Sequence, residues 1–297
     1  MAVDDLLYVD EYPPAESKVR VRRRVRQCGG LTGTALVAAA RLGSRCAYVG
    51  MLGDDDLSRF VIDALECEGI DLTHRVRRAD SPPCHSTIIV DRQRKTRTIF
   101  AAIEGPIGAD LSLPEADLIR ASDVLLIDHH GLEGTIRAAR IARESGVGVV
   151  ADFERDPGPP FDELLPLVDH LIVSNKFARE LTSIDDPARA AAKLHTFDTR
   201  SVVVTCGSAG CWHVDATCRR GPRHCPAFEV EVVDTTGCGD VFHGAYASAL
   251  ARGEDLRRRV TLASAVAALK ATQEGGQAGC PSLETVNRFL KEPWPEV

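Results

Sequence analysis

Short apolar runs alternate with longer amphipathic segments from about residue 120 onward. The apolar runs are rich in Val, Ile and Leu, and they cover residues 124–128, 147–152, 170–175 and 201–207. The segments between them are typical of helices, most clearly around residues 132–144. Buried strands that are joined by helices of about ten residues or more imply crossover connections and a mostly parallel sheet with both faces covered. We therefore predict a doubly wound α/β fold with helices on both sides of the sheet.

The chain before residue 120 follows a different pattern. Residues 85–91 and 96–102 flank a polar turn, which predicts an antiparallel hairpin. Residues 18–26 alternate valines with basic residues, and this predicts a strand with a basic solvent-facing side. Such strands outside the main sheet are either a decoration or a lid.

We expect one domain over residues 1–297, because no Gly/Ser linker divides the chain. The lid strands, over approximately residues 17–27 and 84–103, are inserted in this domain. A di-glycine turn at Gly29 and Gly30 leads into a helix that ends at Gly43.

Composition excludes several classes of protein. The 297 residues are 44% hydrophobic and 27% charged, which is ordinary for a globular chain. A net charge of −7 argues against a general nucleic-acid role. No apolar run approaches the ~20 residues that cross a bilayer, so we expect no membrane role.

The ten cysteines are scattered and form no Cys-x-x-Cys pair, which predicts a reduced, cytoplasmic setting. Their densest group has spacings that match no structural zinc pattern, so a metal is not expected there. This group consists of Cys206, Cys211, His213, Cys218, His224 and Cys225.

The stretch DTTGCGD, Asp234 to Asp240, is the strongest chemical signal. The alternation of Phe228, Val230 and Val232 predicts that a strand leads into it, and helical spacing follows it. Its glycine-flanked amides would therefore lie at a helix N-terminus, where they favour an anion. Phosphoryl transfer needs such amides, together with a carboxylate that takes a proton from the attacking hydroxyl. A glycine turn in which Asp240 caps the helix fits the spacing equally well.

Four motifs resemble, in their order along the chain, those of the ribokinase-like (PfkB) carbohydrate kinases. DTTGCGD resembles the family's Asp-Thr-x-Gly-Ala-Gly-Asp, with Cys238 in the place of Ala. Residues 29–43 and 49–71 together resemble the family's N-terminal signature. Thr205–Cys211 resembles its Thr-x-Gly-x-x-Gly motif, and Gly275–Pro281 resembles its C-terminal loop. Neither a Walker A sequence nor a Gly-x-Gly-x-x-Gly is present.

The resemblance implies roles for individual residues. Asp240 would be the catalytic base, and the amides of Gly237, Cys238 and Gly239 would form the anion hole for the γ-phosphate. Positions against ATP and its Mg²⁺ fall on Thr205, Gly207, Gly210 and Asn175. Positions that contact the sugar fall on Asp4, Gly29 and Gly30.

Two further positions carry open alternatives. Arg97, on the predicted lid, follows a pattern of fructokinase-like members and would reach a sugar or phosphate oxygen; a solvated strand Arg is the other interpretation. Asp234 and Thr236 match positions of a monovalent-cation site for K⁺ that also uses the loop of residues 273–280; turn capping is the other interpretation for Asp234.

The chain departs from the family pattern in three places. Thr34 stands where an Asn usually contacts the sugar, so recognition of the sugar must differ. Ala178 replaces the Glu of the family's Asn-x-x-Glu, which orders Mg²⁺, and Glu180 would lie ~200° away on a helix. Met1 stands three residues before Asp4, so most of the family's first strand would be missing, and we expect that the start site has been assigned too late.

These observations together predict an ATP-dependent kinase that phosphorylates a primary hydroxyl of a sugar or sugar-like molecule, with Mg²⁺. A homodimer with paired lids is expected from the resemblance. The alternatives are a nucleoside kinase of the same fold and a catalytically weakened sugar-binding or regulatory protein. His129 and His130, after the strand that ends at Asp128, are expected near the sugar and on opposite faces of the strand.

Overall fold

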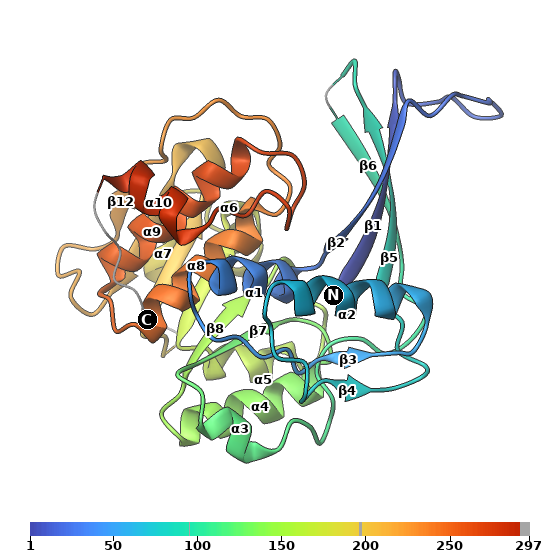
Figure 1. Ribbon diagram of the computed structural model, residues 1–297. Coiled ribbons are helices and arrows are strands. Elements are labelled where there is room, and N and C mark those ends of the chain that lie inside the picture. Colours follow the sequence, from blue (N-terminus) through green and yellow to red (C-terminus); the bar gives the residue numbers. More distant parts are fainter. Residues whose placement is uncertain (95, 196–197, 292–297) are drawn as a thin grey trace.

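A six-stranded sheet is the main sheet of the molecule in the computed structural model shown in Figure 1, which describes residues 1–94, 96–195 and 198–291. The strands lie in the order β12-β11-β10-β9-β8-β7. Strands β7 to β10 pair in parallel, and β11 and β12 add an antiparallel edge. Their bounds are β7 (Val124–Asp128), β8 (Gly148–Asp152), β9 (His170–Ser174), β10 (Ser201–Thr205), β11 (Cys211–Asp215) and β12 (Arg223–Cys225). The doubly wound α/β fold is confirmed.

Helices cover both faces of this sheet. The core on one side of the sheet includes residues of α1 (Leu31–Arg41), α2 (Asp56–Cys67), α8 (Cys238–Ala251), α9 (Leu256–Ala271) and α10 (Leu283–Leu290). The core on the other side includes residues of α3 (Ala116–Arg120), α4 (Leu132–Glu144), α5 (Phe161–Leu164), α6 (Asn175–Thr182) and α7 (Pro187–Leu194). On β8, Val150 belongs to the first core, whereas Val149 and Ala151 belong to the second. Alternation along a strand thus produces two cores, as continuous apolar runs predict.

A four-stranded sheet projects away from this body (Figure 1). Its order is β2-β1-β5-β6, with bounds β1 (Ala2–Val9), β2 (Arg23–Gly29), β5 (Cys84–Asp91) and β6 (Thr96–Ala102). The predicted hairpin is the β5–β6 pair. Strand β1 was not assigned to the lid from the sequence, and it pairs in parallel with β5 in the middle of this sheet. A short two-stranded sheet, β3 (Met51–Leu52) and β4 (Val76–Arg77), lies apart from both.

Two sequence predictions about strands are wrong. The basic run is a strand only from Arg23, because its partner β1 ends at Val9 and leaves residues 18–21 nothing to pair with. The run that contains Phe228 and Val232 is not a strand: the chain leaves the sheet after Cys225 at a proline, which has no N–H to donate. Alternation there reflects an extended loop, in which Val232 is 60% exposed.

No helix within the described residues has the length and apolar character needed to span a membrane.

Candidate active site

The turn of residues 234–240 leads directly into α8, as predicted. Gly237 is the residue before the helix, and its φ of 77° lies in the left-handed region that favours glycine. No side chain caps this helix, so the interpretation of Asp240 as a helix cap is wrong. The first turn of a helix leaves its amides without intrahelical acceptors. Of these amides, that of Cys238 donates to the Thr235 carbonyl at 3.2 Å.

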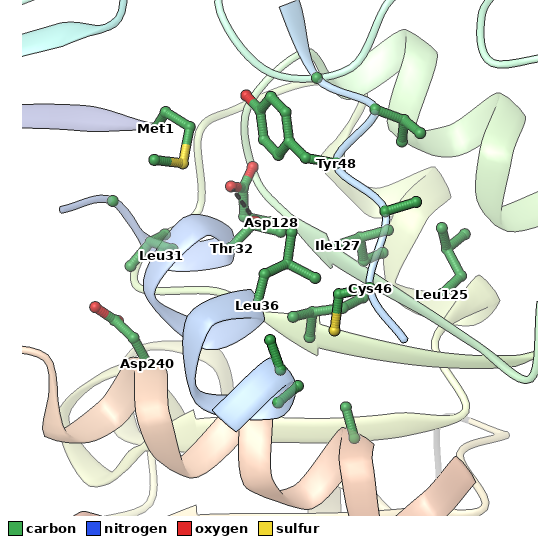
Figure 2. A pocket seen from close by; sticks show the side chains of 18 of the residues that line it. Met1, Leu31, Thr32, Leu36, Cys46, Tyr48, Leu125, Ile127, Asp128 and Asp240 are labelled. Carbon is green, nitrogen blue, oxygen red and sulfur yellow. Dashed lines mark hydrogen bonds between the residues drawn. The ribbon is translucent and has the colours of Figure 1, made fainter. Parts of the chain in front are cut away.

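A cavity of about 1310 Å³ opens beside this turn. Its walls come from α1, β7, the lid sheet and the N-terminus of α8. Figure 2 shows Asp128 beside Thr32 and Asp240 on α8 nearer to Leu31, whereas Leu36 and Ile127 line an apolar part of the cavity. The cavity thus combines a polar end at the helix N-terminus with an apolar trough along β7, a composition typical of small-molecule sites.

Asp4 reaches the polar end of the cavity from β1. It lies against the di-glycine turn so closely that a Cβ at Gly29 would be 2.6 Å from its Oδ2 atom. Gly30 has a φ of 92° and passes the backbone of Ala2 at a distance that excludes a side chain. Burial raises the pKa of Asp4, and a hydrogen bond from Ser86 opposes this shift. The structure therefore brings together Asp4, the glycines and the Asp240 turn, as the resemblance implied.

Asp5 points to the other face of β1. Arg26 donates to its two carboxylate oxygens at 2.9 and 2.7 Å, and His85 lies 3.0 Å away. The Arg26 hydrogen bond holds the pKa of Asp5 far below its usual range. Asp5 and Arg26, a residue of the basic run, thus form a partly buried ion pair within the lid sheet.

The surroundings of Asp240 are acidic. Burial raises its pKa well above the ordinary value, and the negative charge of Asp152, Glu154 and Asp4 adds to the shift. Asp152, at the end of β8, also has a raised pKa because it is buried beside Glu154 and Asp128. A carboxylate with a raised pKa is suited to accept a proton near neutral pH.

Asp234 has the opposite surroundings. Its carboxylate accepts hydrogen bonds from the backbone N–H groups of Thr236 at 2.8 Å and Gly275 at 2.9 Å. Lys270 Nζ lies 3.8 Å from the same carboxylate. Burial raises the pKa of Asp234, but these N–H groups and Lys270 outweigh it, and the net shift is downward. Asp234 therefore ties the turn to the loop that follows α9.

Arg97 reaches the turn from the lid. Its guanidinium donates to Thr236 Oγ1 at 2.6 Å, and it lines the same cavity as Asp4 and Asp240. It is therefore not a merely solvated strand Arg. Thr34, in contrast, is 1% exposed beneath the turn and does not line the cavity.

The residues expected at the nucleotide lie apart from the cavity lining. Thr205 ends β10, and its hydroxyl donates to the Val173 carbonyl at 3.4 Å. Gly207 and Gly210 have positive φ values of 57° and 86°, and a Cβ at Gly210 would be 2.1 Å from the Cys225 carbonyl oxygen. These two glycines allow a tight turn at the carboxyl edge of the sheet.

Asn175 begins α6 at the end of β9. Among the described residues, its Oδ1 atom and the Oδ2 atom of Asp152 are buried oxygens without a hydrogen-bond partner. Ala178 is fully buried in the core, so no carboxylate reaches the site from that position. Glu180 is exposed and lies 4.0 Å from Lys176, as expected for a side chain that points away from Ala178 on the helix.

Sequence reasoning missed several groups of the cavity. Thr32 donates to Asp128 Oδ2 at 2.6 Å, and Glu154 also lines the space. The two histidines lie after β7 has ended, so they do not take opposite faces: their ring centroids are 4.4 Å apart. His130 lines the cavity, and His129 is buried behind it.

No group of three or more His, Cys, Asp or Glu side chains that could hold a metal is found in the ranges that the structure describes.

Comparison with known proteins gives consistent results. Residues 1–283 match the family model described as pfkB family carbohydrate kinase. The ribokinase of Haemophilus influenzae is 28% identical over 274 residues, which cover 89% of this chain and 87% of the relative. An ATP-dependent ribose-1-phosphate kinase of Halopiger xanaduensis is 28% identical and covers 97% of this chain and 95% of its own.

A solved structure is similar throughout. The crystal structure of a ribokinase from Thermotoga maritima superimposes with a TM-score of 0.83 at 28% identity, and it covers 98% of this chain and 97% of its own. The match with the family model spans the lid, the cavity and the Asp234–Asp240 turn alike. The chain therefore belongs to the pfkB family of carbohydrate kinases.

Proposed function

We propose that this kinase transfers the γ-phosphoryl group of ATP to a primary hydroxyl of a sugar held between the lid and α8. The observation that carries the proposal is the position of Asp240. Its carboxylate has a raised pKa, faces the same cavity as Asp4, and belongs to a helix N-terminus that favours an anion. ATP as donor is supported by the similarity to the ATP-dependent ribose-1-phosphate kinase.

In the proposed mechanism, Asp240 accepts the proton of the sugar hydroxyl as that oxygen bonds to the γ-phosphorus. The bond between this phosphorus and the bridging oxygen breaks at the same time, and ADP leaves. Negative charge on the transferring group would be stabilised by the amides of Gly237, Cys238 and Gly239. Arg97, which contacts Thr236 in the same turn, adds a positive charge beside this group.

Asp4 and the glycines of the di-glycine turn would hold the sugar. The carboxylate of Asp4 accepts hydroxyl hydrogens, and Gly29 and Gly30 allow the backbone to approach the ring. The hydroxyl of Thr32 and the ring of His130 line the same space and supply further polar contacts in the absence of an Asn at Thr34. Lid closure would exclude water from the phosphoryl group.

Mg²⁺ would neutralise charge on the ATP phosphates. The residues that fit it are Asn175 and Asp152, because each presents a buried oxygen that accepts no hydrogen bond within the described residues; His243 Nδ1 lies 3.4 Å from the Asp152 oxygen. Amide and carboxylate oxygens are the ligands that Mg²⁺ prefers. The paired residues Asp152 and Ile172 place the ends of β8 and β9 side by side, and Asn175 follows Ile172 by three positions.

We also propose a homodimer that forms through the lid. All seven residues of β6 are exposed, and Ile99 and Phe100 are 52% and 54% exposed there. Apolar side chains on an edge strand favour pairing with another strand. The cysteines are free thiols, which supports a reducing, cytoplasmic setting.

The test is a panel of sugars and nucleosides incubated with ATP and Mg²⁺, in which ADP release is followed and the phosphorylated product is identified. Turnover of a sugar with loss of activity in Asp240→Asn supports the proposal. Turnover of nucleosides alone would favour the nucleoside kinase. Sugar binding by calorimetry without turnover would favour a binding or regulatory protein.

A further inference from the structure

Lys270 is a charged residue at a fully buried position. It lies in the last turn of α9, and its relative exposure is 0%. Burial of an ammonium group is costly unless oxygen atoms replace its water shell. Such a lysine needs an explanation beyond packing, since an apolar residue would fill the space at lower cost.

Three oxygens surround the ammonium group. Lys270 Nζ donates to the Asp234 carbonyl at 2.7 Å and to the Gln273 carbonyl at 3.3 Å, and Asp234 Oδ2 lies 3.8 Å away. An ammonium has three donors and no acceptor, and these partners are all acceptors. Burial lowers the pKa of Lys270, and the Asp234 carboxylate opposes that shift. Carbonyls and a carboxylate arranged in this way are also the surroundings that bind a monovalent metal cation.

The loop after α9 is shaped around this side chain. A Cβ at Gly279 would be 3.1 Å from Lys270 Cε, so a glycine there leaves room for the lysine stem. The same loop supplies the Gly275 N–H that binds Asp234, and Gly276 packs against Gly237. The ammonium is thus connected through Asp234 to the turn whose amides would hold the phosphoryl group.

We propose that the Lys270 ammonium acts as a built-in monovalent cation, which organises the anion-hole turn and makes added K⁺ unnecessary. This inference rests on the proposed kinase function. The side-chain ammonium would take the place of the monovalent cation that was expected at Asp234 and Thr236. Lys270 is a positioning residue, because it acts on the reacting group through Asp234 and the turn.

The experiment compares wild type, Lys270→Ala and Lys270→Met in buffers whose cation is either tetramethylammonium or K⁺. Wild type should have the same kcat in both buffers. In tetramethylammonium, the kcat of Lys270→Ala should be roughly 10- to 100-fold below that of wild type, the range for residues that orient a functional group without touching the substrate. K⁺ should restore most of this kcat. Lys270→Met fills the space without charge and should stay impaired in both buffers. Lys193→Ala, an exposed lysine on α7, is the matched control.

The loss should lie in kcat, with KM for the acceptor unchanged, since the turn acts on the transferring group. A wild type that needs K⁺ would overturn the inference, and so would a Lys270→Ala variant that is fully active without K⁺ below its Tm.

A second readout requires no kinase activity. K⁺ should raise the Tm of Lys270→Ala without substrate, and it should leave the Tm of wild type unchanged. If K⁺ raises the Tm of Lys270→Ala but wild type phosphorylates no acceptor, the proposed function is rejected and the cation site is retained. Turnover with no K⁺-dependent change in the Tm of Lys270→Ala would reject the inference alone.

Discussion

Asp234 and Asp240 stand at the two ends of one turn, and their carboxylates have opposite surroundings. Asp234 accepts two backbone N–H groups and lies beside a buried ammonium. Asp240 is half-buried at the cavity wall, near the negative charges of Asp152 and Glu154. The pKa of Asp234 is consequently lowered, and that of Asp240 is raised well above its ordinary value.

The difference separates structure from chemistry within a few residues. A carboxylate that is satisfied by N–H donors and a cation stays ionised and is a poor base. A carboxylate that is destabilised in its ionised form has a higher affinity for a proton. Pairs of acids whose surroundings drive their pKa values apart commonly divide their tasks in this way. Asp234 therefore holds the backbone of the turn, whereas the surroundings of Asp240 suit the base of the proposed mechanism.

The largest effect is expected for Asp240→Asn. An amide cannot accept the hydroxyl proton, so kcat should fall by about 10²–10⁴-fold. The same change should raise Tm, because it removes a buried negative charge that repels Asp152. Steady-state kinetics and thermal unfolding at pH 7 measure the two effects. Loss of both activity and stability would give Asp240 the same structural role as Asp234 and contradict the division of tasks between them.

The pH profile should show the raised pKa of Asp240. Activity requires the ionised carboxylate, so kcat/KM should fall about tenfold per pH unit as pH drops below the folded-state pKa. Because this pKa is raised, the acid limb should lie above the ordinary Asp range near 3.9. Stability changes in the opposite direction. As pH rises toward the folded-state pKa, wild type should become less stable relative to Asp240→Asn, because its carboxylate ionises less readily in the folded state. An acid limb near pH 4 would contradict the assignment.

A third test addresses the other end of the turn. Asp234→Asn leaves one side-chain acceptor oxygen for two backbone N–H groups and Lys270. Its NH₂ group would also face one of these donors, which is unfavourable because neither group can accept a hydrogen bond. Unfolding in urea should show a loss of about 3 kcal/mol, typical of a buried charge that loses its partner. Because the pKa of Asp234 is lowered, its contribution in wild type should be lost as pH falls through that pKa.

The matched control for this variant is Asp80→Asn. Asp80 is an exposed carboxylate that accepts two hydrogen bonds from Arg78. Its loss should leave the free energy of unfolding nearly unchanged, because water and salt screen surface ion pairs. Equal losses at Asp234 and Asp80 would mean that the turn does not depend on Asp234.

Much of the fold was predictable because it depends on local pattern. The run that forms β7 and the helical spacing of α4 give those elements their observed bounds, since each buries a regular set of apolar side chains. The prediction of a strand at Phe228 was wrong because alternation also occurs in loops, and a strand forms only where a neighbouring strand can pair with it. The place of β1 in the lid could not be predicted from the sequence, because it too depends on which strand lies beside it.

The site was predictable where a motif carries it and not where distant segments meet. Asp4 and Asp240 were placed by motifs, and the structure brings them to one cavity. The contact between Thr32 and Asp128 spans 96 residues and leaves no local pattern. Lys270 did leave a signal: it follows Ala263 and Val266 at the spacing of the buried face of α9. A lysine on such a face indicates a buried charge, but its partners are known only from the fold.

The smallest effect is expected at Arg97, whose contact with Thr236 lies between the two carboxylates in the sequence. Arg97→Met removes the hydrogen bond to Thr236 and should lower kcat/KM by about tenfold, as for one charged hydrogen bond of ~1.5 kcal/mol. Arg97→Lys should recover part of this, and Arg94→Met, on the same hairpin, should have no effect. If Arg97 serves the reacting side of the turn with Asp240, Tm stays unchanged while kcat falls. If Tm falls as in Asp234→Asn, Arg97 belongs to the structural side, and the turn is held from the lid as well as from Lys270.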